Sequence, residues 1–154
     1  MDWLRYDGTD LPEPQLPPGV EIRPYEDEYY EEFFRVLAEA FLPQRRFFDF
    51  RPHDVRQLHT ADGDREQVLA NKENLFVLLD HGRLVGIGEL EGNPIDSVGV
   101  DARAKGRGCG RALMQYGINV LRGRGHRVVE TSVVLGNIPA WRLYNTVGAQ
   151  FDWR

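Results

Sequence analysis

Apolar residues in this chain follow a helical period in some segments and a strand-like pattern in others. Between residues 109 and 121 they recur at intervals of three and four, which predicts an amphipathic helix packed against a sheet. The members of this stripe are Cys109, Ala112, Leu113, Tyr116, Gly117, Val120 and Leu121. Runs rich in Val, Ile and Leu predict strands at 75–79, 83–90, 95–100 and 127–135. The alternation predicts an α/β (α+β) domain with a central, mostly antiparallel sheet.

The rest of the chain adds a strand and three helices to this pattern. Residues 20–25 predict a short strand, and a helix is predicted from Asp27, with an acidic first turn that suits the helix dipole. Its apolar residues at helical spacing are Tyr30, Phe33, Phe34, Leu37, Ala38 and Phe41. A polar helix is expected within residues 63–73. Another helix is predicted to begin near Pro139, since proline suits a first helical turn.

The N-terminal residues have a different composition. Four prolines fall within residues 7–19, which predicts an extended arm without a core. The full length of 154 residues suits one domain with a sizeable core. We therefore expect an arm at residues 1–19 and a single domain at residues 20–154.

Charge and composition narrow the classes of function. The net charge is −5, yet residues 101–127 carry seven basic side chains against Asp101 alone, which favours an anionic ligand held locally. The basic segment is short and nearly without aromatics, so we expect no nucleic-acid partner. We expect no membrane partner and a cytoplasmic protein, because there is no long apolar run and no signal-like N-terminus. The one cysteine and the lack of zinc-like spacing predict no metal site.

The loop before the 109–121 helix has the parts of a diphosphate-binding site. Gly106, Gly108 and Gly110 alternate there, and glycines let the backbone approach a ligand closely with its N–H groups turned toward one anion. The helix that follows adds unpaired N–H groups and the positive end of its dipole. Further positive charge comes from Lys105, Arg107 and Arg111.

Two general phosphate-binding patterns fit this loop less well. A Walker-type loop needs four residues between its glycines and then Gly-Lys-Ser/Thr, which is absent here. A dinucleotide fingerprint would use Glu130 as the ribose-binding acid, but the register fails because Arg111 or Leu113 stands at its sixth position. A nucleotide-linked enzyme remains the less favoured alternative.

The residues resemble a third pattern. The run Lys105-Gly106-Arg107-Gly108-Cys109-Gly110 resembles the Q/R-x-x-G-x-G/A signature of the GCN5-related N-acetyltransferases. Upstream, Val98-Gly99-Val100 resembles the family's fourth strand, and the run from Asn137 to Tyr144 resembles its N-x-x-A-x-x-x-Y segment. Two departures are Lys105 at the Gln/Arg position and a chain that stops at Arg154, where many members have a further strand. The last hairpin is then missing or supplied by another subunit, as in a homodimer.

The resemblance implies a fold, a cofactor and an activity. The implied fold is the family's acyltransferase fold, a twisted sheet flanked by about four helices. The implied acyl donor is acetyl-CoA, passed to a primary amine, most simply of a small molecule, by direct attack in a ternary complex. The implied cofactor contacts are Val98, Gly99, Val100, Lys105, Gly106, Arg107, Gly108, Cys109, Gly110, Arg111 and Asn137. The alternative is an acyl-CoA-binding module of the same fold that senses the cofactor without turnover.

The catalytic residues are only partly implied. Tyr144 is the implied proton donor to the departing thiolate, although it also fits the apolar face of a helix. Pro94 stands where histone-modifying members have a glutamate, so that base does not carry over. Asp96, with the same strand parity, and Glu89 on the preceding strand are the candidate bases acting through water. Cys109 is interpreted as a small loop residue, because the family transfers the acyl group without a covalent intermediate.

Overall fold

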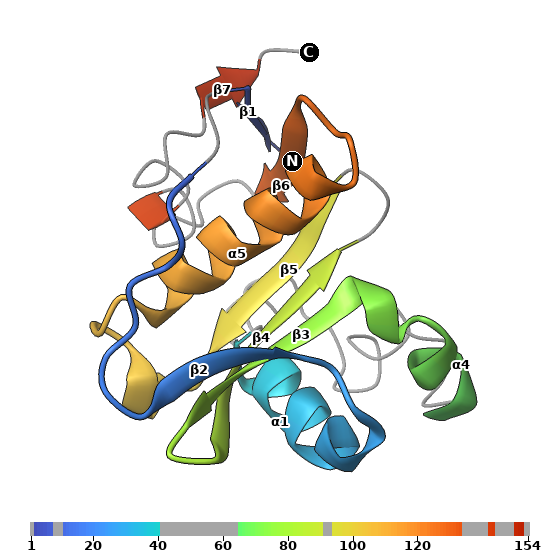
Figure 1. The fold of residues 1–154 in the computed structure, drawn as a ribbon, viewed down its shortest axis with the longest axis vertical. Coiled ribbons are helices and arrows are strands. Elements are labelled where there is room, and N and C mark those ends of the chain that lie inside the picture. The colour runs from blue at the N-terminus through green and yellow to red at the C-terminus, as the bar shows by residue number, and fades with distance from the viewer. Residues whose placement is uncertain are drawn as a thin grey trace.

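One twisted sheet forms the centre of the computed structural model, which describes residues 2–7, 11–40, 65–90, 94–133, 142–143 and 150–152. Within these ranges seven strands pair in the order β2-β3-β4-β5-β6-β1-β7. All neighbours are antiparallel except β5 and β6. The strands are β1 Asp2–Tyr6, β2 Val20–Pro24, β3 Leu75–Asp80, β4 Arg83–Leu90, β5 Pro94–Val100, β6 Val129–Val133 and β7 Gln150–Asp152. The expected mostly antiparallel sheet with helices is confirmed (Figure 1).

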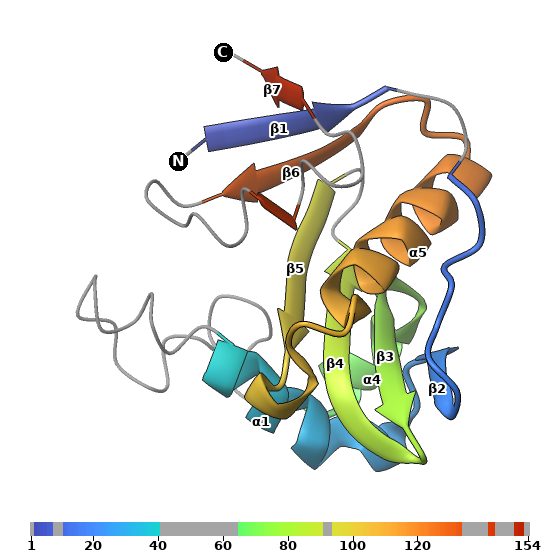
Figure 2. The same cartoon turned by 90° about the vertical axis from the view of Figure 1, so that its left-hand side faces the viewer.

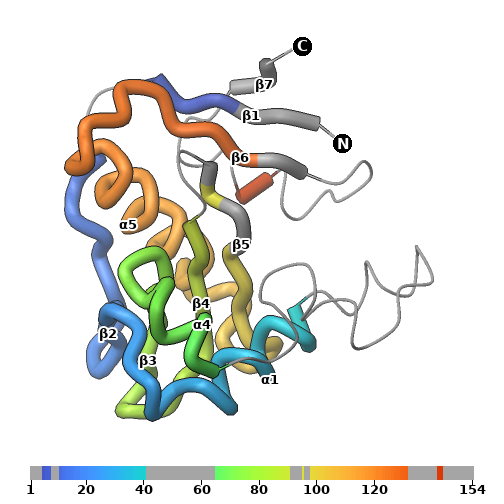
Figure 3. The backbone as a smooth tube through the Cα atoms, turned by 90° about the vertical axis from the view of Figure 1, so that its right-hand side faces the viewer, coloured from blue at the N-terminus to red at the C-terminus, as the bar shows by residue number. Residues whose placement is uncertain are grey.

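Helices lie on both faces of this sheet. They are α1 Tyr30–Ala40, preceded by a 3-10 turn at Asp27–Tyr29, α4 Arg65–Ala70, followed by a 3-10 turn at Lys72–Asn74, and α5 Cys109–Gly123. Strand β3 is buried on both faces, because Leu75, Val77 and Leu79 pack in one core with α1, whereas Phe76 and Leu78 pack in the other with α5. The side views show α1 and α5 on opposite sides of the central strands (Figures 2 and 3).

The N-terminal residues depart from the expected arm. Residues 2–6 form β1, which lies between β6 and β7 and pairs antiparallel with both. A strand from the other end of the chain thus fills an interior position beside β7. The following segment runs along α5 and is not free of the core, since Leu11 and Leu16 pack against the α5 core and Asn119 Nδ2 donates to Leu11 O at 3.1 Å. The expectation of an N-terminal segment without core contacts is therefore wrong.

The buried face of α5 gives a second correction. Helix α5 buries Met114 and Ile118 as well as most of the predicted stripe, whereas Tyr116 and Val120 are only partly buried. A helix that is covered on more than one side buries a wider face than a surface helix does. The predicted strands and the helices at α1, α4 and α5 are otherwise confirmed within a few residues. Phe41, the last apolar residue of the helix predicted from Asp27, and the start of the predicted helix at Pro139 lie outside the described residues.

Candidate functional site

The strand that leads into the glycine loop changes neighbours halfway along its length. From Ser97 to Val100, β5 pairs with β4, but the register shifts between Glu89 and Leu90, which leaves Asp96 as an extra residue. Pairing with β6 is limited to Pro94 opposite Glu130 and Ile95 opposite Thr131, and Thr131 Oγ1 donates to Ile95 O at 2.9 Å. Because a bulge bends a strand, β5 leaves β6 directly after this point (Figure 2). The β6-facing edge of β5 is thereby open beyond Ile95 in the described part of the sheet.

The bulge also affects one sequence argument. The shared parity of Pro94, Asp96 and Val100 assumes a regular strand, in which every second residue lies on one face. With Asp96 as the extra residue, that alternation is interrupted, so parity no longer relates Asp96 to Pro94. Its role as a base stays a prediction.

The glycine loop has the backbone geometry of an anion site. Gly106 and Gly108 have φ values of +79° and +81°, in the left-handed region that favours glycine, and Gly108 is the N-cap of α5. The first amide of α5 to find a main-chain acceptor is that of Ala112, which donates to Gly108 O at 3.0 Å. Within the described residues, the N–H groups from Gly106 to Arg111 make no hydrogen bond to the protein. Exposed donors at a helix N-terminus are therefore available to one ligand.

Two of the four cations of the loop form ion pairs within the described chain, and two do not. Arg103 Nη2 lies 3.1 Å from Asp101 Oδ2, and Arg107 Nη1 lies 2.7 Å from Asp80 Oδ2 at the end of β3. Lys105 and Arg111 are exposed, and no carboxylate of the described chain lies within ion-pairing distance of them. Sequence spacing predicted all of these charges near one turn but not which of them are already neutralised. The side chains left for an incoming anion are Lys105 and Arg111.

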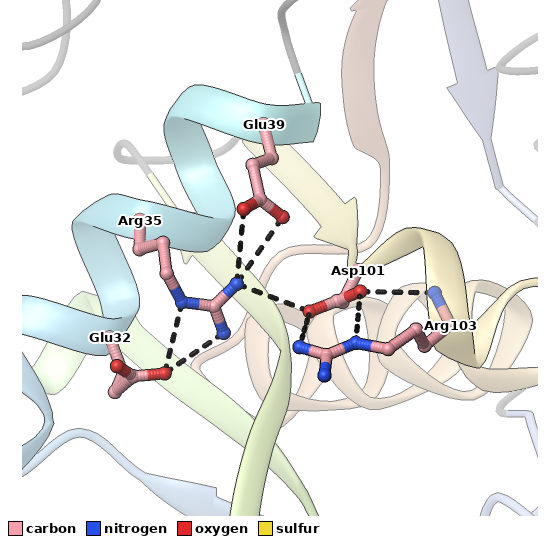
Figure 4. A network of polar contacts seen from close by, with 5 residues as sticks. All are labelled: Glu32, Arg35, Glu39, Asp101 and Arg103. Carbon is pink, nitrogen blue, oxygen red and sulfur yellow. Dashed lines mark hydrogen bonds and ion pairs between the residues drawn. The ribbon is translucent and has the colours of Figure 1, made fainter.

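A buried carboxylate at the start of the loop was not anticipated from the sequence. Asp101 is 3% exposed, and its side chain accepts from the Arg103 main-chain N–H at 3.0 Å, which caps the 3-10 turn Ala102–Ala104. Its Oδ2 also accepts from Arg35 Nη1 of α1 at 3.2 Å (Figure 4). Hydrogen bonds from Arg103, and then from Arg35, hold the pKa of Asp101 well below its ordinary value. The only sequence signal was a lone acid among seven bases.

Cys109 is part of the helix rather than the loop. It is the first residue of α5 and is 2% exposed, so its interpretation as a loop residue is corrected. Burial raises the pKa of its thiol, and this effect outweighs the nearby Arg107 guanidinium. A buried thiol with a raised pKa is a poor nucleophile, which agrees with a packing role.

The remaining predicted site residues are described unevenly. Glu89 is 4% exposed on β4, opposite Leu75 of β3 and Ser97 of β5. Asn137 and Tyr144 lie outside the described residues. Their neighbour Leu143 packs against the α5 core, and a Cβ built on Gly110 would lie 3.4 Å from Leu143 Cδ2. Leu143 of the C-terminal motif therefore lies next to the first turn of α5.

The described part of the chain contains neither a metal-binding cluster nor a membrane-spanning helix. No group of three or more His, Cys, Asp or Glu side chains gathers there in a way that could hold a metal ion. None of its helices combines the length and apolar character that crossing a membrane requires.

Comparison with known proteins extends these findings. Mycothiol acetyltransferase of Thermomonospora curvata is 33% identical over 146 residues, an alignment that covers 91% of this chain and 47% of that protein. The chain thus spans about half the length of the curated relatives it matches. A GCN5-related N-acetyltransferase from Sphaerobacter thermophilus superposes with a TM-score of 0.70 at 23% identity, over 98% of this chain and 48% of the other.

A second solved structure carries the cofactor. YncA of Salmonella typhimurium, a putative acetyltransferase solved with acetyl-CoA, superposes with a TM-score of 0.67 at 18% identity, over 84% of this chain and 79% of the other. At these identities the superpositions show a shared fold. The sequence profile of the acetyltransferase (GNAT) family matches residues 20–149, most of the chain. The chain therefore belongs to the acetyltransferase (GNAT) family, and its glycine loop and the separation of β5 from β6 agree with this.

Proposed function

We propose that this chain transfers an acetyl group from acetyl-CoA to a primary amine of a small molecule. The observation that carries the proposal is the row of unpaired main-chain N–H groups from Gly106 to Arg111 at the start of α5. Such a row, with the charges of Lys105 and Arg111 beside it, is complementary to the diphosphate of coenzyme A. No metal takes part in the proposed reaction.

The open edge of β5 supports the path of the cofactor from this loop. Val98, Gly99 and Val100 lead into the loop, and beyond Ile95 the β6-facing edge has unpaired main-chain groups in the described sheet. The pantetheine arm contains two amides, which can pair with such an edge as an added strand does. The thioester would then lie between β5 and β6, where an amine can reach it.

The chemistry requires two proton movements. An ammonium cannot attack a carbonyl, so a base must remove a proton, directly or through water, before the nitrogen lone pair forms the new C–N bond. The C–S bond then breaks, and a proton donor neutralises the departing thiolate. We assign the donor role to Tyr144, and Asn137 to the cofactor. Glu89 and Asp96 are the candidate bases, and the buried position of Glu89 beside β5 favours it.

The acceptor follows partly from the relatives. Several of them, each aligned over only about half its length, are named mycothiol acetyltransferase. Amines chemically related to mycothiol therefore come first in an acceptor panel, followed by polyamines, aminoglycosides and lysine peptides.

We also propose that the protein is cytoplasmic, that it has no nucleic-acid or membrane partner, and that it assembles as a homodimer. Fractionation, a binding assay with duplex DNA and vesicles, and sedimentation test these three points.

The test of the proposed function combines binding with turnover. Calorimetry should show coenzyme A binding to the wild-type chain, and free thiol should be released when acetyl-CoA meets a suitable amine. Tyr144→Phe should leave coenzyme A affinity unchanged and lower kcat by about 100-fold, since a positioned proton donor contributes about 10²–10⁴-fold.

The matched control is Tyr25→Phe. The Tyr25 hydroxyl is buried and has no hydrogen-bond partner in the described chain, so its removal should change neither binding nor turnover. If coenzyme A does not bind the wild-type chain, the proposed function is wrong. If coenzyme A binds but no amine in the panel is acetylated, the chain is a sensing module and the catalytic part of the proposal fails.

A further inference from the structure

The contact between helix α1 and the glycine loop passes through one buried side chain. Asp101 is the residue between β5 and the loop, and both of its carboxylate oxygens are used. Oδ1 accepts from the Arg103 main chain, and Oδ2 accepts from Arg103 Nη2 at 3.1 Å and from Arg35 Nη1 at 3.2 Å. A buried carboxylate that is satisfied on both oxygens fixes the groups around it, because any displacement leaves a charge unpaired.

Arg35 is held equally firmly on the helix side. Its guanidinium bonds Glu32 at 2.9 Å and Glu39 at 3.2 Å, one turn before and one turn after it on α1 (Figure 4). The fork geometry of arginine lets it bridge these carboxylates and Asp101 at once. The orientation of α1 and the start of the loop are thus defined by one shared network.

A second contact brings α1 to the same strand. A Cβ built on Gly99 would lie 2.8 Å from the Ala40 Cβ, so the last residue of α1 packs directly on the backbone of β5. This apolar contact is two residues before Asp101. Together the two contacts connect α1 to the strand and loop that form the proposed cofactor site.

We propose that Asp101, through Arg35, is a positioning residue that couples occupancy of the glycine loop to the order of helix α1. The inference rests on the proposed function, because it takes coenzyme A as the ligand of the loop. A ligand that immobilises the loop also immobilises Asp101, and Arg35 transmits this restraint to α1.

Hydrogen exchange with and without saturating coenzyme A tests this coupling on the full chain. In the wild type, coenzyme A should slow exchange both at Gly106–Arg111 and in the last turns of α1, the latter by about fivefold or more, the usual lower range of coupling between sites. Arg35→Met removes the link to α1 but keeps the Asp101 cap on Arg103. It should retain protection of the loop and lose the coenzyme A effect on α1, whereas Arg35→Lys should restore part of it.

The matched control removes a different arginine contact next to the same helix. Arg65 Nε lies 2.7 Å from Asp27 Oδ1, just before α1 begins, in an exposed pair that does not involve the loop. Arg65→Met should keep the coenzyme A effect on α1. A purely structural Arg35 would change exchange in α1 equally with and without ligand.

Three outcomes are distinguishable. Absence of coenzyme A binding to the wild type refutes the proposed function. Protection of the loop without any change in wild-type α1 overturns the coupling, and so does an undiminished ligand effect on α1 in Arg35→Met. If Arg35→Met is not folded by circular dichroism, Asp101→Asn replaces it and should likewise lose the ligand effect on α1.

Discussion

The loop between β5 and α5 has two halves that are held in different ways. In the first half, Asp101–Ala104, which we call the clamped half, Asp101 caps the turn Ala102–Ala104 and pairs with Arg103 and Arg35, so its buried charge is neutralised within the protein. In the second half, Gly106–Arg111, which we call the open half, the main-chain donors have no protein acceptor in the described chain. The row of main-chain donors available to a ligand therefore lies in the open half, and the clamped half connects it to the rest of the protein.

The largest expected effect comes from a change in the open half. Gly108→Ala should weaken coenzyme A binding by at least 100-fold in calorimetry, because a Cβ at φ +81° strains the backbone and obstructs the approach of a diphosphate. Open space surrounds this position in the unliganded chain, so no clash within the protein is expected. The strain alone should cost about 1–2 kcal/mol of unfolding free energy.

Gly125→Ala is the matched control for this change. Gly125 has φ +99° and open space around it, but lies just past the far end of α5, about 22 Å from the loop by helix rise. Both variants should lose similar stability, and only Gly108→Ala should lose binding. Equal loss of binding in the two would contradict a special role for the open half.

Charge removal sharpens the comparison with intermediate effects. Lys105→Gln and Arg111→Gln should each weaken coenzyme A binding by about tenfold, since hydrogen bonds to charged groups are worth about 1.5–3 kcal/mol. Arg107→Gln should change it by about twofold or less, because that guanidinium is already 2.7 Å from Asp80 Oδ2.

Affinities measured at low and high salt provide the check. Removing a cation that faces the ligand reduces the salt dependence of binding, whereas removing a paired one does not. If Arg107→Gln weakened coenzyme A binding more than Lys105→Gln did, the assignment of Arg107 as the neutralised cation and Lys105 as the available one would be wrong.

Acid titration probes the clamped half and gives the smallest effect. Because the pKa of Asp101 is lowered in the folded chain, its contribution to stability is complete above the unfolded pKa of about 3.9 and is lost as the pH falls below it. Asp101→Asn should therefore cost about 2 kcal/mol at pH 7, and the difference from wild type should shrink below about pH 4. Urea unfolding at several pH values measures this, and a difference that grows toward acid pH would contradict the assigned ion pairs.

Much of the fold could be predicted from the sequence because its signals are local. The period of apolar residues located β3, β4, β5 and α5, and the alternating glycines located the loop, since left-handed backbone at Gly106 and Gly108 favours glycine. These patterns depend on residues close together in the chain.

The rest depended on contacts between distant residues. Strand β1 pairs with residues between 123 and 149 positions away, and nothing in its five residues indicates a place between β6 and β7. Arg35 and Asp101 are 66 positions apart, so their network could not be read from either segment. The bulge at Asp96 interrupted a parity argument that is valid only for a regular strand. Charge spacing located the cations of the loop, but their partners came from other elements.

The most direct measurement is an amide-resolved NMR titration of the chain with coenzyme A. If the donors of the open half hold the diphosphate, the largest shifts should occur at the N–H groups of Gly106–Arg111, with 3′-dephospho-coenzyme A, which keeps the diphosphate, giving the same pattern and pantetheine alone leaving these amides unshifted. Shifts concentrated elsewhere, or equal shifts with pantetheine, would contradict the central claim.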